Sequence, residues 1–250
     1  MRTAAAVFAL IVSTIFFGTL VILASVLGVK DREGSIYDWA PRWWARIIVW
    51  ASRVKVVLHD VPGARVGRHV FVVNHVTLFD VLAVATVVPR VKFVAKAELS
   101  NIPLFSRAMR SAGMVFIERA NRKAAFESYR NVAGRISEGG SVVVFAEGTR
   151  GTSYALRPLK KGPFVLAIDA AAPVVPTVVY GTMQVLTRNP FRVYGGTVHV
   201  HFLEPVPTAG LDYDQRDTIA AKVHARMAEV LRSEYGVESP LWEPRRAVIG

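Results

Sequence analysis

The feature that most constrains this chain is an uncharged apolar run near its N-terminus. The run, AAAVFALIVSTIFFGTLVILASVLGV, extends from Ala4 to Val29. As an α-helix rising ~1.5 Å per residue it would be roughly 39 Å long, which exceeds the roughly 30 Å hydrocarbon core of a bilayer. A cleaved signal peptide is the alternative, but its apolar core usually has only ~7–15 residues, and no clear small-x-small cleavage site is present. The run therefore predicts a helix that spans the membrane or dips deeply into it.

A second N-terminal segment, PRWWARIIVWASRV, has the pattern of an interfacial helix. At helical spacing an apolar group falls on one side and a basic group on another. The apolar group is Trp43, Ile47, Trp50 and Val54, and the basic group is Arg42, Arg46 and Arg53. An amphipathic helix packed on the protein's own core would show the same pattern, but the apolar run beside it favours the membrane surface, where tryptophan is common. Residues 1–53 are therefore predicted to form a two-part membrane anchor.

The charge balance and the lack of cysteine limit the possible chemistry. Lys and Arg number 31 against 19 Asp and Glu, a formal net charge of +12. This charge suits an anionic membrane surface, a phosphorylated substrate or an acyl carrier. Nucleic acid is a poorer fit, because the basic residues are dispersed and follow a membrane anchor. Without cysteine there is no disulfide, no thiolate zinc site and no cysteine nucleophile.

From residue 54 onward, short runs rich in β-branched residues alternate with helical patterns. The runs begin near residues 54, 69, 91, 114, 141, 174 and 197. Several are apolar throughout, as expected of strands covered on both faces. Helices are expected at 121–137, at 162–172 and at about 214–235. The alternation predicts an α/β domain over residues 54–250, with a mixed, largely parallel sheet flanked by helices, and leaves the strand order open.

Polar residues follow three of these runs at the point where each run ends. Asn74 and His75 follow FVV, Glu118 and Arg119 follow MVFI, and residues 146–150 follow SVVVF. In open α/β sheets, ligands bind outside the carboxyl ends of the strands. The three groups are therefore expected to converge in one crevice.

His75 and Asp80 in NHVTLFD permit two interpretations. In the first, His75 only ends a strand, and Asp80 lies in the first turn of a helix capped by Thr77, because TLFD fits the Ser/Thr-x-x-acid capping pattern. In the second, the same turn brings Asp80 back to His75, and the pair removes the proton of an acceptor hydroxyl. The chain has no G-x-S-x-G elbow and no cysteine, so direct attack by a bound hydroxyl is the simplest scheme.

The stretch FAEGTRG supplies candidate phosphate ligands. Gly148 lets the backbone approach a ligand closely, Thr149 offers a hydroxyl, and Arg150 offers a planar fork of donors. Glu147 is a candidate to orient that arginine or to bind a substrate hydroxyl. A polar turn with a local ion pair is the structural alternative for the whole stretch.

Four further residues are candidate substrate ligands. Arg119 and the pair Lys160 and Lys161 offer positive charge, and Asn74 lies beside His75 in the sequence. An exposed arginine and a solvated lysine pair at a helix start are the structural alternatives for the three cations.

In chain order, the blocks NHVTLFD, GMVFIER, FAEGTRG and VVPTVVYG resemble the four motif blocks of the glycerolipid acyltransferase family, especially the 1-acylglycerol-3-phosphate acyltransferases. The stretches AKAELSNIPLF and LKKGPFVLAI also lie where that family has similar ones, so the resemblance covers roughly residues 54–205. Three positions depart from the family pattern: Ala146 stands where proline is usual, Gly151 where serine is common, and Thr77 where serine is frequent. These departures leave the charged chemistry intact.

The resemblance implies an α/β fold like that of the glycerol-phosphate acyltransferases, with an N-terminal membrane-embedding helical pair. The implied reaction moves a fatty acyl chain from acyl-CoA or acyl carrier protein to the 2-hydroxyl of 1-acylglycerol 3-phosphate, without a metal or redox cofactor. The implied general base is His75 with Asp80 as its partner. The implied phosphate ligands are Arg119 and residues 147–150, and Pro176 would help shape the acyl-chain side. The implied location is the cell membrane, with the catalytic domain on its cytoplasmic face.

Three alternatives stay open at this point. In the first, the acceptor is another molecule of the same class, such as glycerol 3-phosphate, a different lysophospholipid or an amino-acid lipid. In the second, the same histidine acts with water as acceptor, which would make the protein a lipid hydrolase. In the third, the chain is a basic membrane-binding protein that keeps the fold of an acyltransferase without its activity.

Overall fold

The computed structural model describes residues 2–117, 136, 140–187 and 190–242. Seven strands form the main sheet, in the order β1-β9-β6-β2-β5-β3-β4. Their bounds are β1 Val54–His59, β2 Val70–Val73, β3 Val91–Lys96, β4 Val115–Ile117, β5 Ser141–Phe145, β6 Val174–Tyr180 and β9 Gly196–Phe202. A small antiparallel pair, β7 Leu186–Thr187 and β8 Arg192–Val193, lies outside it.

Within the main sheet, β9 runs antiparallel to β6, and the other neighbouring pairs run parallel. The predicted mixed, largely parallel sheet is therefore confirmed. The central strands β2 and β5 are buried along their whole length, which explains why their sequences are apolar throughout.

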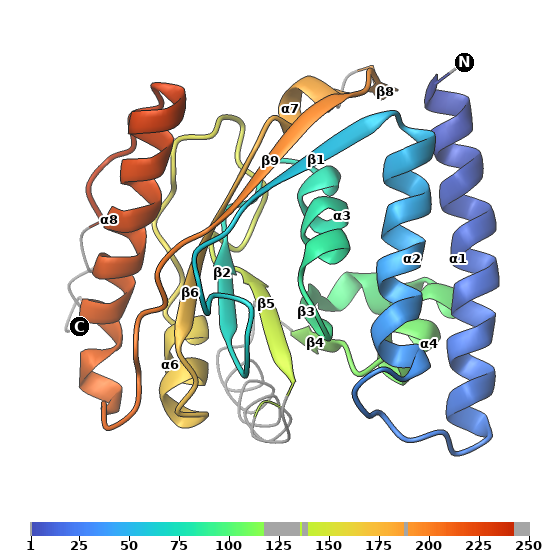
Figure 1. Cartoon of the computed structure of the whole chain (residues 1–250), viewed down its shortest axis with the longest axis horizontal. Coiled ribbons are helices and arrows are strands. Elements are labelled where there is room, and N and C mark those ends of the chain that lie inside the picture. The colour runs from blue at the N-terminus through green and yellow to red at the C-terminus, as the bar shows by residue number, and fades with distance from the viewer. Residues whose placement is uncertain (1, 118–135, 137–139, 188–189, 243–250) are drawn as a thin grey trace.

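Helices cover both faces of this sheet (Figure 1). Their bounds are α1 Arg2–Val26, α2 Ile36–Ala51, α3 Leu78–Val87, α4 Pro103–Ser111, α6 Gly162–Asp169, α7 Thr182–Val185 and α8 Arg216–Tyr235, with 3-10 turns η1 Ala97–Asn101 and η2 Tyr213–Gln215. The first hydrophobic cluster joins α1, α2 and α3 to one sheet face, and the second joins α6 and α8 to the other. The chain is thus a three-layer α/β structure.

The N-terminal helices form an antiparallel pair at one side of the molecule, with α1 outermost (Figure 1). Helix α1 turns a stripe that includes Phe17 and Val21 towards the core, while Phe8 on its outer side is 70% exposed. Helix α1 is long and apolar enough to cross a membrane by length and composition. On α2, the predicted outward tryptophans Trp43 and Trp50 are exposed, and the next element, β1, begins at Val54.

This helix pair is joined to the α/β layers by side-chain packing. Phe17 of α1 and Ile48 of α2 belong to the same hydrophobic cluster as Phe71 and Phe145 of the sheet. The indole N–H of Trp44 donates to the hydroxyl of Thr14 at 2.9 Å, which ties α2 to α1. The predicted division into residues 1–53 and 54–250 stays a prediction about which part enters the membrane.

The strand order places a topological switch point between β2 and β5. The chain leaves β2 through α3 and reaches β3 beyond β5, whereas it leaves β5 through α6 and reaches β6 on the far side of β2. The two connections depart in opposite directions and use helices on opposite faces, so a crevice opens at the carboxyl ends of these two strands. His75 follows β2 at this edge, and residues 146–150 follow β5.

Helix prediction was less complete than strand prediction. The expected helix at 162–172 is α6, which ends earlier at Asp169, and the expected helix at 214–235 is α8, preceded by the turn η2. Helix α4, which packs on α1, was not predicted. The helix expected at 121–137 lies outside the described residues except for Ile136, which is buried and helical.

Candidate active site

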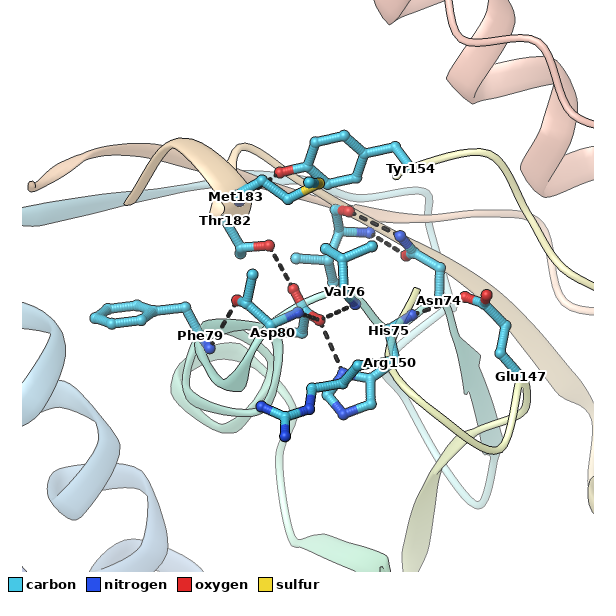
Figure 2. Close-up of polar contacts among 12 residues, drawn as sticks. Asn74, His75, Val76, Phe79, Asp80, Glu147, Arg150, Tyr154, Thr182 and Met183 are labelled. Carbon is cyan, nitrogen blue, oxygen red and sulfur yellow. Dashed lines mark hydrogen bonds and ion pairs between the residues drawn. The ribbon is translucent and has the colours of Figure 1, made fainter. Parts of the chain in front are cut away.

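The turn after β2 brings Asp80 back to His75, as the sequence predicts. Thr77 caps α3, since its hydroxyl accepts the backbone N–H of Phe79 at 3.0 Å. Asp80 Oδ2 in turn accepts the backbone N–H groups of Val76 and Thr77, at 2.6 and 2.8 Å. The same oxygen lies 2.8 Å from Nδ1 of His75 (Figure 2). The helix cap and the His–Asp pair are therefore one structure.

The hydrogen bonds around Asp80 define the proton position on His75. Asp80 is fully buried, and an oxygen that already accepts two N–H groups receives the imidazole as a third donor. Nδ1 of His75 therefore carries the proton, and Nε2 is left with its lone pair. The imidazole packs on the Phe145 ring, with the ring centres 4.3 Å apart.

The second oxygen of the carboxylate has a partner from a distant segment. The hydroxyl of Thr182, at the start of α7, donates to Asp80 Oδ1 at 2.6 Å. Figure 2 shows Thr182 and His75 on different sides of the Asp80 carboxylate. Thr182 is also fully buried, so Oδ1 is fixed by a group that solvent does not reach.

Glu147 supports His75 from behind and is 97% buried, with 3% of its surface exposed. Its Oε1 accepts the backbone N–H of His75 at 2.9 Å. Burial raises the pKa of Glu147 to about 7, although hydrogen bonds from the backbones of His75 and Arg157 and the charge of Arg157 act in the opposite direction. The carboxyl of Glu147 thus holds the main chain of the histidine and is not among the residues that line the cavity described below, and its predicted substrate role stays a prediction.

The loop after Glu147 turns out towards solvent. Gly148 has φ +82°, a left-handed conformation that favours glycine, and the methylenes of Lys160 pack over it. Thr149 and Arg150 are exposed, and Figure 2 shows the Arg150 side chain beside the His75 ring. Thr149 and Arg150 line the same cavity as His75, whereas Lys160 lies against Gly148. The ligand roles of all three stay predictions.

Three predicted substrate ligands have structural partners instead. Asn74 is fully buried, and its amide donates to the Val179 carbonyl and accepts the Val179 N–H, so it joins β2 to β6. Lys161 forms a 2.8 Å ion pair with Asp217 of α8. Pro176 is buried within β6, beside Val72 of β2.

None of these three lines the cavity within the described part of the chain, and their ligand roles stay predictions. Residue type and spacing did not show which way each side chain points. The remaining candidate, Arg119, lies outside the described residues.

A cavity of about 510 Å³ opens beside His75. Its walls come from α1, α2, α3, α4 and β3, and they are mainly apolar. The apolar lining includes Phe17, Val21, Trp44, Val81, Phe93, Phe105, Met109 and Met114, and His75, Gly148, Thr149 and Arg150 line the same cavity. A base, a cation and an apolar chamber therefore share one space, formed partly by the N-terminal helices.

Two site residues escaped the sequence analysis. Thr182 immediately follows the VVPTVVYG block, and only the fold brings it to Asp80. Arg157 donates from Nη2 to the hydroxyl of Thr149 at 2.8 Å and from Nη1 to the Arg150 carbonyl at 3.4 Å. Arg157 lies in the short segment between FAEGTRG and LKKG. Because that segment joins two motif stretches, its position in the sequence could have marked it as a candidate site residue.

Comparison with known proteins agrees with this geometry. The family model described as Acyltransferase matches residues 55–180, which include the strands β2, β5 and β6 and the His75–Asp80 turn. The chain belongs to the acyltransferase family. The predicted resemblance to the glycerolipid acyltransferases is thereby confirmed.

Two relatives within this family carry the same description, 1-acyl-sn-glycerol-3-phosphate acyltransferase. The protein from Haemophilus influenzae is 30% identical over 216 residues, covering 82% of this chain and 88% of its own. The protein from Cocos nucifera is 27% identical over 228 residues, covering 90% of this chain and 73% of its own.

A solved acyltransferase structure has the same fold. The 1-acyl-sn-glycerophosphate acyltransferase PlsC from Thermotoga maritima superposes with a TM-score of 0.76 at 22% identity, covering 96% of this chain and 97% of its own. The coverage extends beyond the residues matched by the family model, so the shared acyltransferase fold includes most of the N-terminal helix pair.

Proposed function

We propose that this acyltransferase transfers a fatty acyl chain from an acyl thioester to the 2-hydroxyl of 1-acylglycerol 3-phosphate, which gives phosphatidic acid. The observation that carries the proposal is the shared cavity, in which Nε2 of a carboxylate-held His75, the guanidinium of Arg150 and an apolar chamber meet. The relatives described as enzymes of this reaction support the choice of acceptor.

The reaction begins with the acceptor hydroxyl donating a hydrogen bond to Nε2 of His75. As the hydroxyl oxygen attacks the thioester carbonyl carbon, its proton passes to Nε2, a transfer that typically contributes ~10²–10⁴-fold to the rate. Asp80 holds the ring through Nδ1 and stabilises the imidazolium. When the tetrahedral intermediate collapses, the C–S bond breaks, the imidazolium returns its proton to the thiolate, and the new ester is released with a free thiol.

The acceptor phosphate would bind at the loop after β5. Arg150 has a fork of N–H donors that matches phosphate oxygens, and Arg157 holds this loop through Thr149. Lys160, packed over Gly148, adds a third positive charge. These contacts would place the phosphate at the polar mouth of the cavity, with the acyl chain in the apolar chamber.

The membrane would supply the lysophospholipid acceptor directly to this cavity. Helices α1 and α2 expose apolar side chains such as Phe8 and Trp50, at 70% and 78%, and an apolar surface of this kind marks a membrane contact. Their other faces line the cavity through Phe17 and Trp44. The helix pair would therefore sit in the bilayer, with the basic chain drawn to anionic headgroups.

The donor would be acyl-CoA or acyl carrier protein, and both are intracellular carriers, which favours the cytoplasmic face of the cell membrane. The steps above consist of proton transfer and acyl transfer between groups that His75 and Asp80 orient. They call for no metal or redox cofactor.

The experiment is an acceptor panel with the full chain in detergent or vesicles. One acyl-CoA or, in a parallel series, the same acyl chain on acyl carrier protein is offered with 1-acylglycerol 3-phosphate, glycerol 3-phosphate, lysophosphatidylcholine or an acylated amino acid. Lipid products and free thiol are measured. The expected result is phosphatidic acid formed in step with thiol release, lost by about 10³-fold or more in His75→Ala. Free fatty acid without acceptor dependence would indicate a hydrolase, and no thiol release with any acceptor or either donor would indicate a non-catalytic protein.

A further inference from the structure

Three histidines gather on the sheet face opposite the cavity. His199 and His201 are two residues apart on β9, so their side chains point to the same side of the strand. His59 ends β1 and is the register partner of His201 in the neighbouring strand. The alternate residues of β9, Val198, Val200 and Phe202, face the core shared with α1 and α2. His199 and His201 therefore face the α8 side.

The imidazole nitrogens of these residues converge. One ring nitrogen of each histidine lies within 4.8 Å of those of the other two. Nε2 of His59 is 2.9 Å from Nδ1 of His199, and the ring of His201 stacks on that of His59 at 4.0 Å. The chain has six histidines, and half of them are in this cluster, although His59 and His199 are separated by 140 positions.

The cluster has the donor set of a transition-metal site. We propose that His59, His199 and His201 bind a first-row divalent transition-metal ion, such as Zn²⁺ or Ni²⁺. Three imidazoles with an open fourth position suit zinc, nickel or copper, and the absence of oxygen and thiolate from this ligand set disfavours Mg²⁺ and Ca²⁺. The sequence predicted no metal ligand, because no local spacing links β1 to β9.

The imidazole rings have to reorient on binding, because those of His59 and His201 are stacked nearly parallel. Two imidazole nitrogens on a tetrahedral zinc, each with a bond of about 2.0–2.1 Å, lie about 3.3 Å apart. The His59–His199 distance therefore widens by a few tenths of an ångström as the ion replaces the proton between them, and the His201 ring tilts out of its stack. His59 is exposed on an edge strand, so it can move and the ion can enter there.

A hydroxyl group from α8 contacts one ring of the cluster. Nε2 of His201 lies 2.5 Å from the hydroxyl of Tyr235 at the end of α8, and outer contacts of this kind orient metal ligands. A bound ion would join β1, β9 and α8 on the side of the sheet away from the reaction.

The test uses the full chain without a histidine tag, in detergent, freed of metal with a chelator. Isothermal titration with ZnCl₂ or NiCl₂ is expected to show one saturable site per chain. The melting temperature is expected to rise by about 5 °C or more at roughly 100-fold excess over the dissociation constant, and MgCl₂ to leave it unchanged. His59→Ala, at an exposed position, and His199→Ala are expected to abolish both signals, and Tyr235→Phe to weaken binding about tenfold or more.

His75→Ala is the matched control, since it removes a histidine from the active site. This variant is expected to bind the ion as the unchanged chain does. The proposal is overturned if the unchanged chain binds neither ion saturably, if His59→Ala and His199→Ala keep the site, or if His75→Ala loses it. A retained site in His59→Ala would mean that the three rings form only an aromatic stack against Tyr235.

Discussion

The hydroxyl of Thr182 donates to Asp80 Oδ1 at 2.6 Å, although 102 positions separate the two residues in the chain. Oδ2 of the same carboxylate receives His75 and two backbone N–H groups. Asp80 is thus fixed from the β2–α3 turn on one side and from the β6–α7 turn on the other. The His–Asp pair depends on the packing of β2 against β6 as well as on its local turn.

Thr182→Val is expected to lower kcat about tenfold and to leave KM for both substrates nearly unchanged, because Thr182 positions Asp80 and touches neither substrate. Thr182→Ser keeps the hydroxyl and should restore kcat. Equal losses in the Ser and Val variants would show that only packing matters.

Arg150→Ala is expected to raise KM for the phosphorylated acceptor about 10–100-fold, the value of a hydrogen bond to a charged group. Arg157→Ala should raise it less, by roughly threefold to tenfold, because Arg157 acts through Thr149. Lys222→Ala on α8 removes the same charge from an exposed site and is the control. If all three variants had the same KM, the loop after β5 would not be the phosphate site.

Glu147→Gln tests the buried carboxyl through the pH dependence of stability. The pKa of Glu147 is about 7 in the folded chain against 4.5 in the reference state. Below about pH 4.5 the group is protonated in both states, whereas between pH 4.5 and 7 only the folded state keeps the proton, so stability falls as pH rises. Glutamine does not titrate. The free energy of unfolding of Glu147→Gln, relative to that of the unchanged chain, should therefore rise by up to about 3 kcal/mol across this window.

The measurement is urea unfolding of Glu147→Gln and the unchanged chain at several pH values from about 5 to 8. The comparison uses the difference between the two free energies of unfolding, so the titration of all other groups cancels to first order. A difference that stays constant over this range would contradict a raised pKa at Glu147.

Gly18→Leu tests the apolar chamber. Gly18 lines the cavity, and a Cβ built on it would lie 3.4 Å from Cβ of Ala108 in α4. A leucine would fill space between α1 and α4, so the ratio of kcat/KM for a short acyl donor to that for a long one should rise about tenfold or more. Ser25→Leu places the same side chain at an exposed position of α1 and should leave the ratio unchanged. An unaltered ratio in Gly18→Leu would place the acyl chain elsewhere.

The sequence was sufficient for the strands and for the His–Asp turn. Both depend on local patterns: apolar runs such as residues 70–73, and the cap that Thr77 and Asp80 form within one helical turn. The strand order was not predictable in the same way. Strand β9 inserts between β1 and β6, and no periodicity records pairings between segments so far apart.

Side-chain direction could not be predicted for several residues around the site. Asn74 and Glu147 were predicted as substrate ligands because they flank the reactive residues, yet each is buried and bonded to the main chain. Lys161 looked like Lys160 in the sequence, but only Lys161 meets Asp217 on α8. In each case the partner comes from a different element, so its identity depends on the assembled fold.

The shared packing of α1 and α2 with the sheet has a practical consequence. Deleting residues 1–53 to obtain a water-soluble enzyme would remove Phe17, Val21 and Trp44 from the cavity wall and uncover Phe71 and Phe145 in the core. A truncated protein would therefore aggregate or fold without its acyl chamber. Purification therefore has to keep the whole chain, because the N-terminal helix pair and the sheet form one packed body.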